Sequence, residues 1–184
     1  MRIAVSVPII APPYSQTPRA TRIALLVTDD PGVMLEQQIL ETRTAASTLG
    51  IDLDLARVSG RDYIRAFAAM AARRPEALIV GAQSVFLRDR KQIIELAAKY
   101  RLPAIYEWPR QVQDGGLMSY GANDVETYAQ VASYIDRIFK GAKPGDMPVW
   151  QPSKLRLVIN LTTAKALGLA LPQSLLVRAD EVIH

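Results

Sequence analysis

The sequence contains no cysteine, and its one histidine, His184, is the last residue. The absence of cysteine excludes disulfide bonds, thiolate nucleophiles and cysteine-ligated metals. A single terminal imidazole leaves no buried histidine for general acid or base catalysis, so we expect no catalytic residues and no enzyme. The longest apolar runs, such as residues 23–27, are far shorter than the about 20 residues of a membrane-spanning helix.

Basic residues are not concentrated anywhere in the chain. The 22 Lys and Arg residues are interleaved with 18 Asp and Glu residues, and the net charge is +4. This distribution predicts no nucleic-acid partner. The chain has no metal-ligand spacing and no nucleotide-binding glycine motif, so we expect neither a metal nor a cofactor. Its 184 residues, 49% hydrophobic and 22% charged, are typical of one globular domain.

The first 20 residues differ from the rest. Arg2 precedes a short apolar run, which Pro8 interrupts before it reaches the length of a signal peptide. We interpret residues 1–20 as an N-terminal arm or an extra strand, with no convincing export signal.

From residue 21 onward, short β-branched runs alternate with longer segments of helical period. This alternation predicts parallel strands joined by crossover helices, an α/β fold with a doubly wound, mostly parallel sheet flanked by helices. The expected strands are 22–28, 51–58, 77–80, 103–106 and 117–120, with 51–58 at an edge. In the helix expected at 62–73, we predict that Ile64, Phe67, Ala68 and Ala71 are buried.

The clearest amphipathic helix follows the fifth strand. Its apolar positions are Tyr128, Val131, Ala132, Ile135 and Ile138. We expect this helix to complete an α/β solute-binding lobe over residues 21–143. Three prolines within residues 144–152 then predict a linker. Residues 144–184 are expected to form a proline-rich hinge crossing, an apolar strand at 155–159 and C-terminal helices.

Polar and aromatic residues follow the expected strands. In an open α/β sheet, ligands bind outside the carboxyl ends of the strands, where loops and helix N-termini converge. That rule selects four loops, which are Thr28-Asp29-Asp30, Gly81-Ala82-Gln83-Ser84, Glu107-Trp108 and Tyr120-Gly121. Carboxylates and ring faces suit a polar small molecule with an amino group or an aromatic ring. The alternative is that the acids cap the next helix and that the aromatics fill the rim of the core.

The acidic pair at 29–30 also resembles that of a response-regulator receiver. A receiver needs a phosphoacceptor aspartate after its third strand, and here Gly81 stands at that point. The pair Gly115-Gly116 is more typical of a tight turn than of a nucleotide loop.

Three stretches of the sequence resemble the substrate-binding proteins of ABC transporters, including tryptophan receptors. They are GGLMSYG at 115–121, SYIDRIFKGAKPGDMPVWQPSKLRLVINLTTAKALGL at 133–169 and LLVRADEVI at 175–183. The resemblance extends more loosely to residue 21. It implies the second lobe of a type 1 periplasmic-binding-protein fold. The ligand-binding residues that it implies are Thr28, Asp29, Gln83, Ser84, Glu107, Trp108, Tyr120 and Asn123.

The same resemblance implies a function and partners. The chain would be a solute-binding component of an ABC transporter, or a truncated lobe of one, that binds an amino-acid-like or aromatic small molecule. An ABC permease would be its partner, and its location would be periplasmic or membrane-associated. The alternatives are a regulatory or interaction module without transport, a remnant with the same fold, or an enzyme of unknown reaction.

Relative to this family, the first lobe and the export signal before it are missing from the sequence. In the family, the run that matches 155–159 returns to the sheet of the first lobe. We therefore expect this run to lack a partner, which is an association hazard for an apolar strand. It would pair with a second copy of the chain to form a homodimer, or residues 1–7 would replace part of the missing lobe.

Overall fold

The computed structural model describes residues 20–29, 32–150, 152 and 154–184. The expected arm therefore lies outside the described residues, apart from Ala20, and so does Asp30. The elements in chain order are β1 (Arg22–Thr28), α1 (Val33–Leu49), β2 (Asp52–Val58), α2 (Tyr63–Ala72), β3 (Ala77–Val80), α3 (Ser84–Arg88), α4 (Arg90–Lys99), β4 (Ala104–Tyr106), α5 (Pro109–Gln113), β5 (Met118–Ala122), α6 (Asp124–Phe139), the 3-10 helix η1 (Pro144–Asp146), β6 (Leu155–Asn160), α7 (Leu161–Leu167), α8 (Gln173–Leu176) and β7 (Glu181–Ile183).

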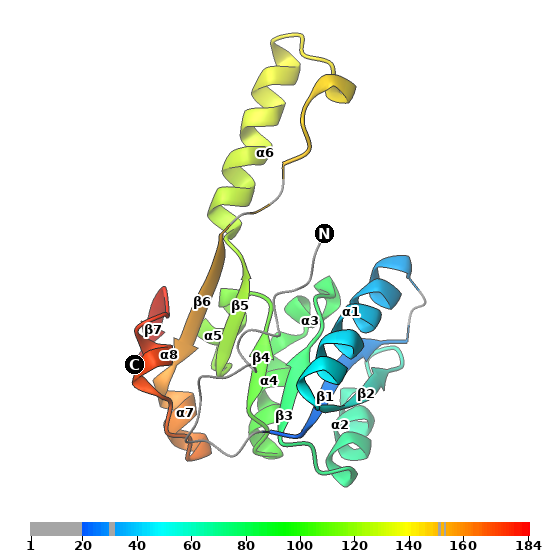
Figure 1. The fold of residues 1–184 in the computed structure, drawn as a ribbon, viewed down its shortest axis with the longest axis vertical. Coiled ribbons are helices and arrows are strands. Elements are labelled where there is room, and N and C mark those ends of the chain that lie inside the picture. The colour runs from blue at the N-terminus through cyan, green and yellow to red at the C-terminus, as the bar shows by residue number, and fades with distance from the viewer. Residues whose placement is uncertain (1–19, 30–31, 151, 153) are drawn as a thin grey trace.

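A seven-stranded sheet with helices on both faces forms the centre of the molecule (Figure 1). The strand order is β2-β1-β3-β4-β5-β6-β7, and the pairs from β2 to β5 are parallel. The chain moves in opposite directions from β1, first to β2 and then to β3. The predicted doubly wound, mostly parallel α/β sheet is therefore confirmed, and β2 lies at an edge as expected.

Strand β1 is buried on both faces, as its nearly unbroken apolar sequence predicts. Ala24 and Leu26 point into a core cluster that includes residues of α2 and α4. Ile23, Leu25 and Val27 point into a second cluster that includes residues of α1 and α7. The alternation of side chains along one strand thus supplies both cores of the lobe.

Helix α2 buries a different stripe from the one expected. Asp62 caps it by accepting a hydrogen bond from the backbone N–H of Arg65. The buried residues are Tyr63, Ala66, Phe67 and Met70. The prediction is correct for Phe67 but wrong for Ile64, whose exposed fraction is 62%, and for Ala68. Both lie off the stripe that begins at Tyr63.

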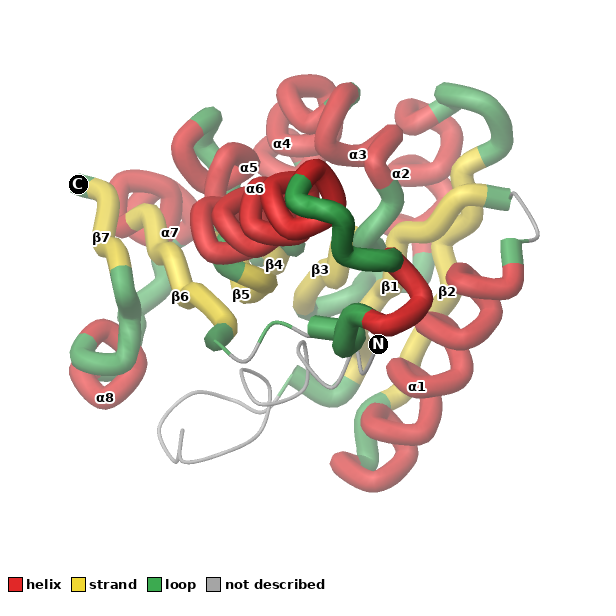
Figure 2. The backbone as a smooth tube through the Cα atoms, turned by 90° about the horizontal axis from the view of Figure 1, so that it is seen from above, coloured by secondary structure: helices red, strands yellow, loops and turns green. Residues whose placement is uncertain are grey.

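Helix α6 is predicted correctly as a helix, but its apolar face does not pack on this sheet. The helix rises from the end of β5 and stands clear of the other helices (Figure 1). The exposed fractions of Tyr128, Val131 and Ile135 are 74%, 46% and 47%. Seen from above, α6 passes over the carboxyl ends of the strands (Figure 2). The expectation that this helix completes the core of the lobe is therefore wrong.

Strand β6 belongs to the same sheet, so the expectation of an unpartnered strand is wrong. It pairs antiparallel with β5 over five residue pairs, from Met118 with Ile159 to Ala122 with Leu155. Its other edge pairs with β7. Because β5 pairs along one edge of β6 and β7 pairs with residues 158–160 on the other, only the first residues of β6 have an open edge. The expected homodimer through 155–159 loses its physical basis, and the expected substitute strand at 1–7 lies outside the described residues.

Candidate functional site

The register of the sheet brings the predicted ligand-binding residues to one edge. Leu25, Ile79, Ile105 and Met118 lie opposite one another in a row across β1, β3, β4 and β5. Because these strands are parallel, the residues that follow this row all lie at the carboxyl end of the strands, which we call the carboxyl edge. The predicted residues lie two to five positions beyond it, and they are Thr28, Asp29, Gln83, Ser84, Glu107, Trp108, Tyr120 and Asn123.

At the end of β1, the backbone N–H of Asp29 donates a hydrogen bond to the carbonyl of Val58, at an N···O distance of 3.1 Å. This bond fixes the first residue after the strand beside the end of β2. Helix α1 begins at Val33, and its N-cap position is occupied by Gly32 without a side-chain cap. The exposed Asp29 therefore does not cap that helix, and its carboxylate faces solvent at the edge.

After β3, Gln83 is folded back onto the turn that precedes it. Its Nε2 donates to Oε1 of Gln38 at 2.7 Å, and its own Oε1 is enclosed without a hydrogen-bond partner among the described residues. A Cβ atom at Gly81 would lie 2.6 Å from this Oε1 and 2.9 Å from the carbonyl oxygen of Leu26. Glycine is required here because any side chain would displace Gln83 or the strand.

Sequence reasoning did not identify Gln38 as part of this edge. It lies on the buried side of α1 with an exposed fraction of 5%. A polar residue between Leu35 and Ile39 on an apolar helix face is the signal that would have drawn attention to it, because a buried amide requires a partner.

After β4, Glu107 and Trp108 lie against the end of β5. A Cβ atom at Gly121 would come within 2.2 Å of the carbonyl oxygen of Glu107, so the backbones touch at this point. The backbone N–H of Trp108 donates to Oε1 of Gln111 at 3.2 Å, which helps to start α5. The loop that carries Glu107 and Trp108 is thus held from both sides.

Of the remaining four predicted residues, Thr28 ends β1 and Ser84 begins α3, while Tyr120 and Asn123 have structural contacts. Tyr120 is half-buried and packs against the core cluster on the α1 side of the sheet. Asn123 caps α6, since its Oδ1 accepts a hydrogen bond from the backbone N–H of Val125 at 3.1 Å. Tyr120 thus lies in β5 and Asn123 at the start of α6, and β3 and β4 separate both from β1.

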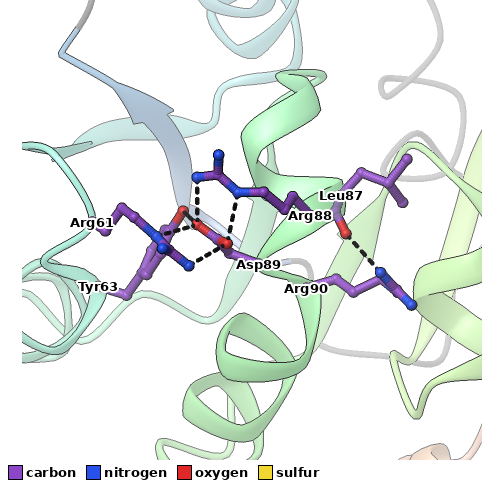
Figure 3. Close-up of polar contacts among 6 residues, drawn as sticks. All are labelled: Arg61, Tyr63, Leu87, Arg88, Asp89 and Arg90. Atoms are coloured by element: carbon purple, nitrogen blue, oxygen red, sulfur yellow. Dashed lines mark hydrogen bonds and ion pairs between the residues drawn. The ribbon is translucent and has the colours of Figure 1, made fainter.

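A buried carboxylate beside this edge was not predicted. The Asp89 side chain, 3% exposed, accepts hydrogen bonds from the Tyr63 hydroxyl at 2.8 Å, from Nε and Nη2 of Arg61 and from Nε and Nη2 of Arg88 (Figure 3). These donors, led by Arg88, hold the pKa of Asp89 well below its usual range. Burial, together with the bond to Asp89, raises the pKa of Tyr63 to about 12.

This network joins the segment that follows β2 to the segment that follows β3. Arg61 belongs to the turn after β2, Tyr63 begins α2, and Arg88 and Asp89 connect α3 to α4. Two cations therefore share one buried anion, and the Arg61 and Arg88 side chains remain 65% and 61% exposed. The arrangement holds the start of α2 against the junction of α3 and α4.

Within the described ranges, no group of three or more histidine or acidic side chains is placed to hold a metal ion. No helix in this part of the chain has the length and hydropathy to cross a membrane. The side chains at the edge are carboxylates, an amide, hydroxyls and aromatic rings, which can form hydrogen bonds, charge pairs and ring contacts.

The sheet and its crossover helices define one lobe of the α/β fold of periplasmic binding proteins. The sequence profile of the ABC transporter substrate binding proteins matches residues 15–183, so the chain belongs to that family. The members of this family are solute-binding proteins and not enzymes. No curated protein matches the sequence significantly.

Solved structures show the same fold. A structure of the ABC domain in complex with L-Trp from Streptococcus pneumoniae is 24% identical, with a TM-score of 0.82 over 92% of this chain and 59% of its own. A conserved domain protein from Vibrio cholerae is 23% identical, with a TM-score of 0.79 over 88% of this chain and 54% of its own. A ligand-free, open substrate-binding protein with adhesive properties from Clostridium difficile is 18% identical, with a TM-score of 0.66 over 90% and 55%. The chain spans between half and three-fifths of the length of these relatives.

Proposed function

We propose that this chain forms one wall of the ligand cleft of an ABC transporter substrate-binding protein, and that the ligand is an amino-acid-like or aromatic small molecule. The observation that carries the proposal is the row of polar and aromatic side chains at the carboxyl edge, in a chain that belongs to this family. The L-Trp complex of the pneumococcal relative supports the ligand class.

In this proposal, the ligand is recognised by three kinds of group. The exposed carboxylate of Asp29 pairs with the ligand's ammonium group, and the ring of Trp108 stacks on its side chain. The Gln83 amide is the third group, and it turns outward from its contact with Gln38 so that its Oε1, enclosed and unpaired in the free chain, accepts a hydrogen bond from the ligand. Thr28, Ser84, Glu107, Tyr120 and Asn123 complete the predicted set.

We further propose that a second α/β lobe packs on the exposed apolar face of α6 and supplies the other wall. Over two-fifths of each relative's chain has no counterpart here, while the family match continues through α6. The apolar stripe on α6 contains Tyr128, Ile135 and Phe139, and Phe139 is 86% exposed. An apolar stripe of this size is typical of a helix face that another protein surface covers. The partner permease and an extracytoplasmic location follow from the family.

Calorimetric titration of L-Trp, L-Phe and L-Leu into the chain tests the proposal. We expect saturable binding of at least one of them, with a Kd near 1 mM because one wall alone gives only about 4 kcal/mol of binding free energy. Substitution of Asp29→Asn should weaken binding about tenfold by loss of the ammonium contact. The matched control is Asp52→Asn, because Asp52 is also exposed but begins β2, at the amino end of the strands and away from the carboxyl edge.

The absence of saturable heat with all three amino acids at concentrations of several millimolar would refute binding by this lobe alone. Equal affinities for the wild type and the Asp29 variant would refute the assigned role of that carboxylate. Substitution of Trp108→Ala separates the two recognition modes, because it should weaken L-Trp and L-Phe more than L-Leu.

A further inference from the structure

A cavity of about 210 Å³ lies at the end of the lobe opposite the predicted ligand edge. It is enclosed by the last turn of α4, the amino ends of β4 and β5, and α7, which stands at the far end of the sheet from α6 (Figure 1). Its walls are mostly aliphatic and include Ile94, Leu102, Leu117 and Leu167. A cavity of about 150 Å³ with similar walls holds benzene in another protein, so this one has room for a ring with a short substituent.

A buried hydroxyl opens onto this cavity. Tyr106 lines it, is only 3% exposed, and forms no hydrogen bond with a described residue. Burial alone raises the pKa of this hydroxyl, with no hydrogen bond contributing. A Cβ atom at Gly116, which also lines the cavity, would lie 2.7 Å from Cε2 of the ring, next to the carbon that bears the hydroxyl.

The Tyr106 side chain borders open space. It is a lining residue of the cavity, and its hydroxyl has no hydrogen-bond partner among the described residues. A buried hydroxyl without a partner is costly, so a polar ligand atom here would gain a full hydrogen bond.

A cation stands at the mouth. Arg101 lines the cavity, is exposed, and forms no ion pair with any residue in the described part of the chain. The described lining residues include no Asp or Glu. The third polar side chain, Thr163, already donates its hydroxyl to the carbonyl of Gly115 at 2.9 Å. The cavity thus offers one hydroxyl, one guanidinium and aliphatic walls, which fits an anion with an apolar body and excludes a free ammonium group.

We propose that this cavity is a second small-molecule site that binds a small aromatic or branched monocarboxylate. The apolar body lies between α4 and α7, the carboxylate pairs with Arg101, and a ligand oxygen accepts a hydrogen bond from the Tyr106 hydroxyl. The lack of an acidic side chain distinguishes this ligand from the amino acid proposed at the carboxyl edge. The two sites lie at opposite ends of the strands, so the failure of one proposal leaves the other standing.

NMR titration of the ¹⁵N-labelled chain with benzoate tests this site, with the backbone amides of Gly115 and Gly116 as reporters. We expect saturable shifts of both amides, and binding of the neutral analogue benzamide that is about fivefold weaker because it lacks the charge. Substitution of Arg101→Gln should remove this preference. Lys99→Gln is the matched control, because Lys99 is exposed on α4 but does not line the cavity.

Two further variants keep the test decisive. Tyr106→Phe retains the ring and should weaken benzoate about threefold or more by loss of one hydrogen bond. Ala166→Leu adds bulk at an exposed position of the wall and should abolish the shifts while the rest of the spectrum is unchanged. No saturable shift at about 20 mM benzoate, well above the weakest useful affinities, would overturn the proposal, as would equal binding of benzamide by the wild type.

Discussion

Replacement of the buried carboxylate at position 89 should destabilise the lobe by a predictable amount. Asp89→Asn keeps the shape of the side chain but removes the charge that holds Tyr63, Arg61 and Arg88 together. Tyr63 is fully buried, and a hydrogen bond from its hydroxyl to a charged acceptor contributes about 1.5–3 kcal/mol. The two arginines are 65% and 61% exposed, so water replaces most of what they lose. We expect a loss of about 1.5–3 kcal/mol at neutral pH.

The effect should depend on pH in one direction. The pKa of Asp89 is lowered in the folded state from its ordinary value of 3.8. A lowered carboxyl pKa contributes stability that is complete above the ordinary value and is lost as the pH falls toward the folded-state value. The difference between wild type and Asp89→Asn should therefore be constant near neutrality and should shrink once the pH falls below about 4.

Urea unfolding followed by circular dichroism, at pH 7 and at pH 3, measures both quantities. Asp136→Asn is the control, because Asp136 is exposed on α6 and pairs only with Lys140 one turn away, a contact that contributes about 0.5 kcal/mol or less. If Asp89→Asn is as stable as the wild type at pH 7, or if the difference grows on acidification, the assigned role of the buried carboxylate is wrong.

Three further changes test the packing. Gly121→Ala should destabilise the lobe and distort the candidate edge, because the added Cβ would lie 2.2 Å from the carbonyl oxygen of Glu107. Gly145→Ala is the control, since a Cβ there meets no atom within 4 Å, and it should not change the free energy of unfolding in urea. Phe67→Ala should cost about 3–5 kcal/mol, and Ile64→Ala on the exposed side of the same helix less than about 1 kcal/mol, in the same assay. Tyr128 is exposed on α6, so Tyr128→Ser should lower the binding of a hydrophobic dye such as ANS. The free energy of unfolding should change by less than about 0.5 kcal/mol. A larger loss of stability would show that α6 packs on this lobe.

The strands of the parallel sheet were predictable because each is a short apolar run bounded by a turn signal. The expected 22–28 and 77–80 match β1 and β3 to the residue. Helix α4 buries Ile93, Ile94 and Ala97 as its period predicts. In these segments, local pattern and burial coincide, so sequence periodicity alone is enough.

Helix α6 shows the limit of what sequence periodicity can predict. Its spacing predicts an apolar face, and the helix has one, but a repeat of 3.6 residues does not say which body covers that face. Strand β6 was predicted to lie in another sheet because, in the family that the sequence resembles, the matching run returns to the sheet of the first lobe. The β5–β6 pairing is a long-range contact, and the short β7 carries too little sequence signal to show that the sheet continues there.

The carboxyl-end rule located the loops of the candidate site without any knowledge of side-chain contacts. It did not find Gln38, which reaches Gln83 from a helix, nor the network around Asp89, which joins the segment after β2 to the junction of α3 and α4. Such contacts depend on how helices are placed against the sheet. A run such as Arg88-Asp89-Arg90 otherwise has the pattern of a solvated surface.

The contact at Gly121 gives the lobe a mechanical property. Gly121 touches the backbone of Glu107 and lies three residues before α6 begins at Asp124, while its own strand is clamped by five pairs to β6. A displacement of α6 is therefore passed through the paired strands β5 and β6 to the loop that carries Trp108. A partner that binds α6 and moves it would therefore also shift Glu107 and Trp108 at the candidate ligand edge.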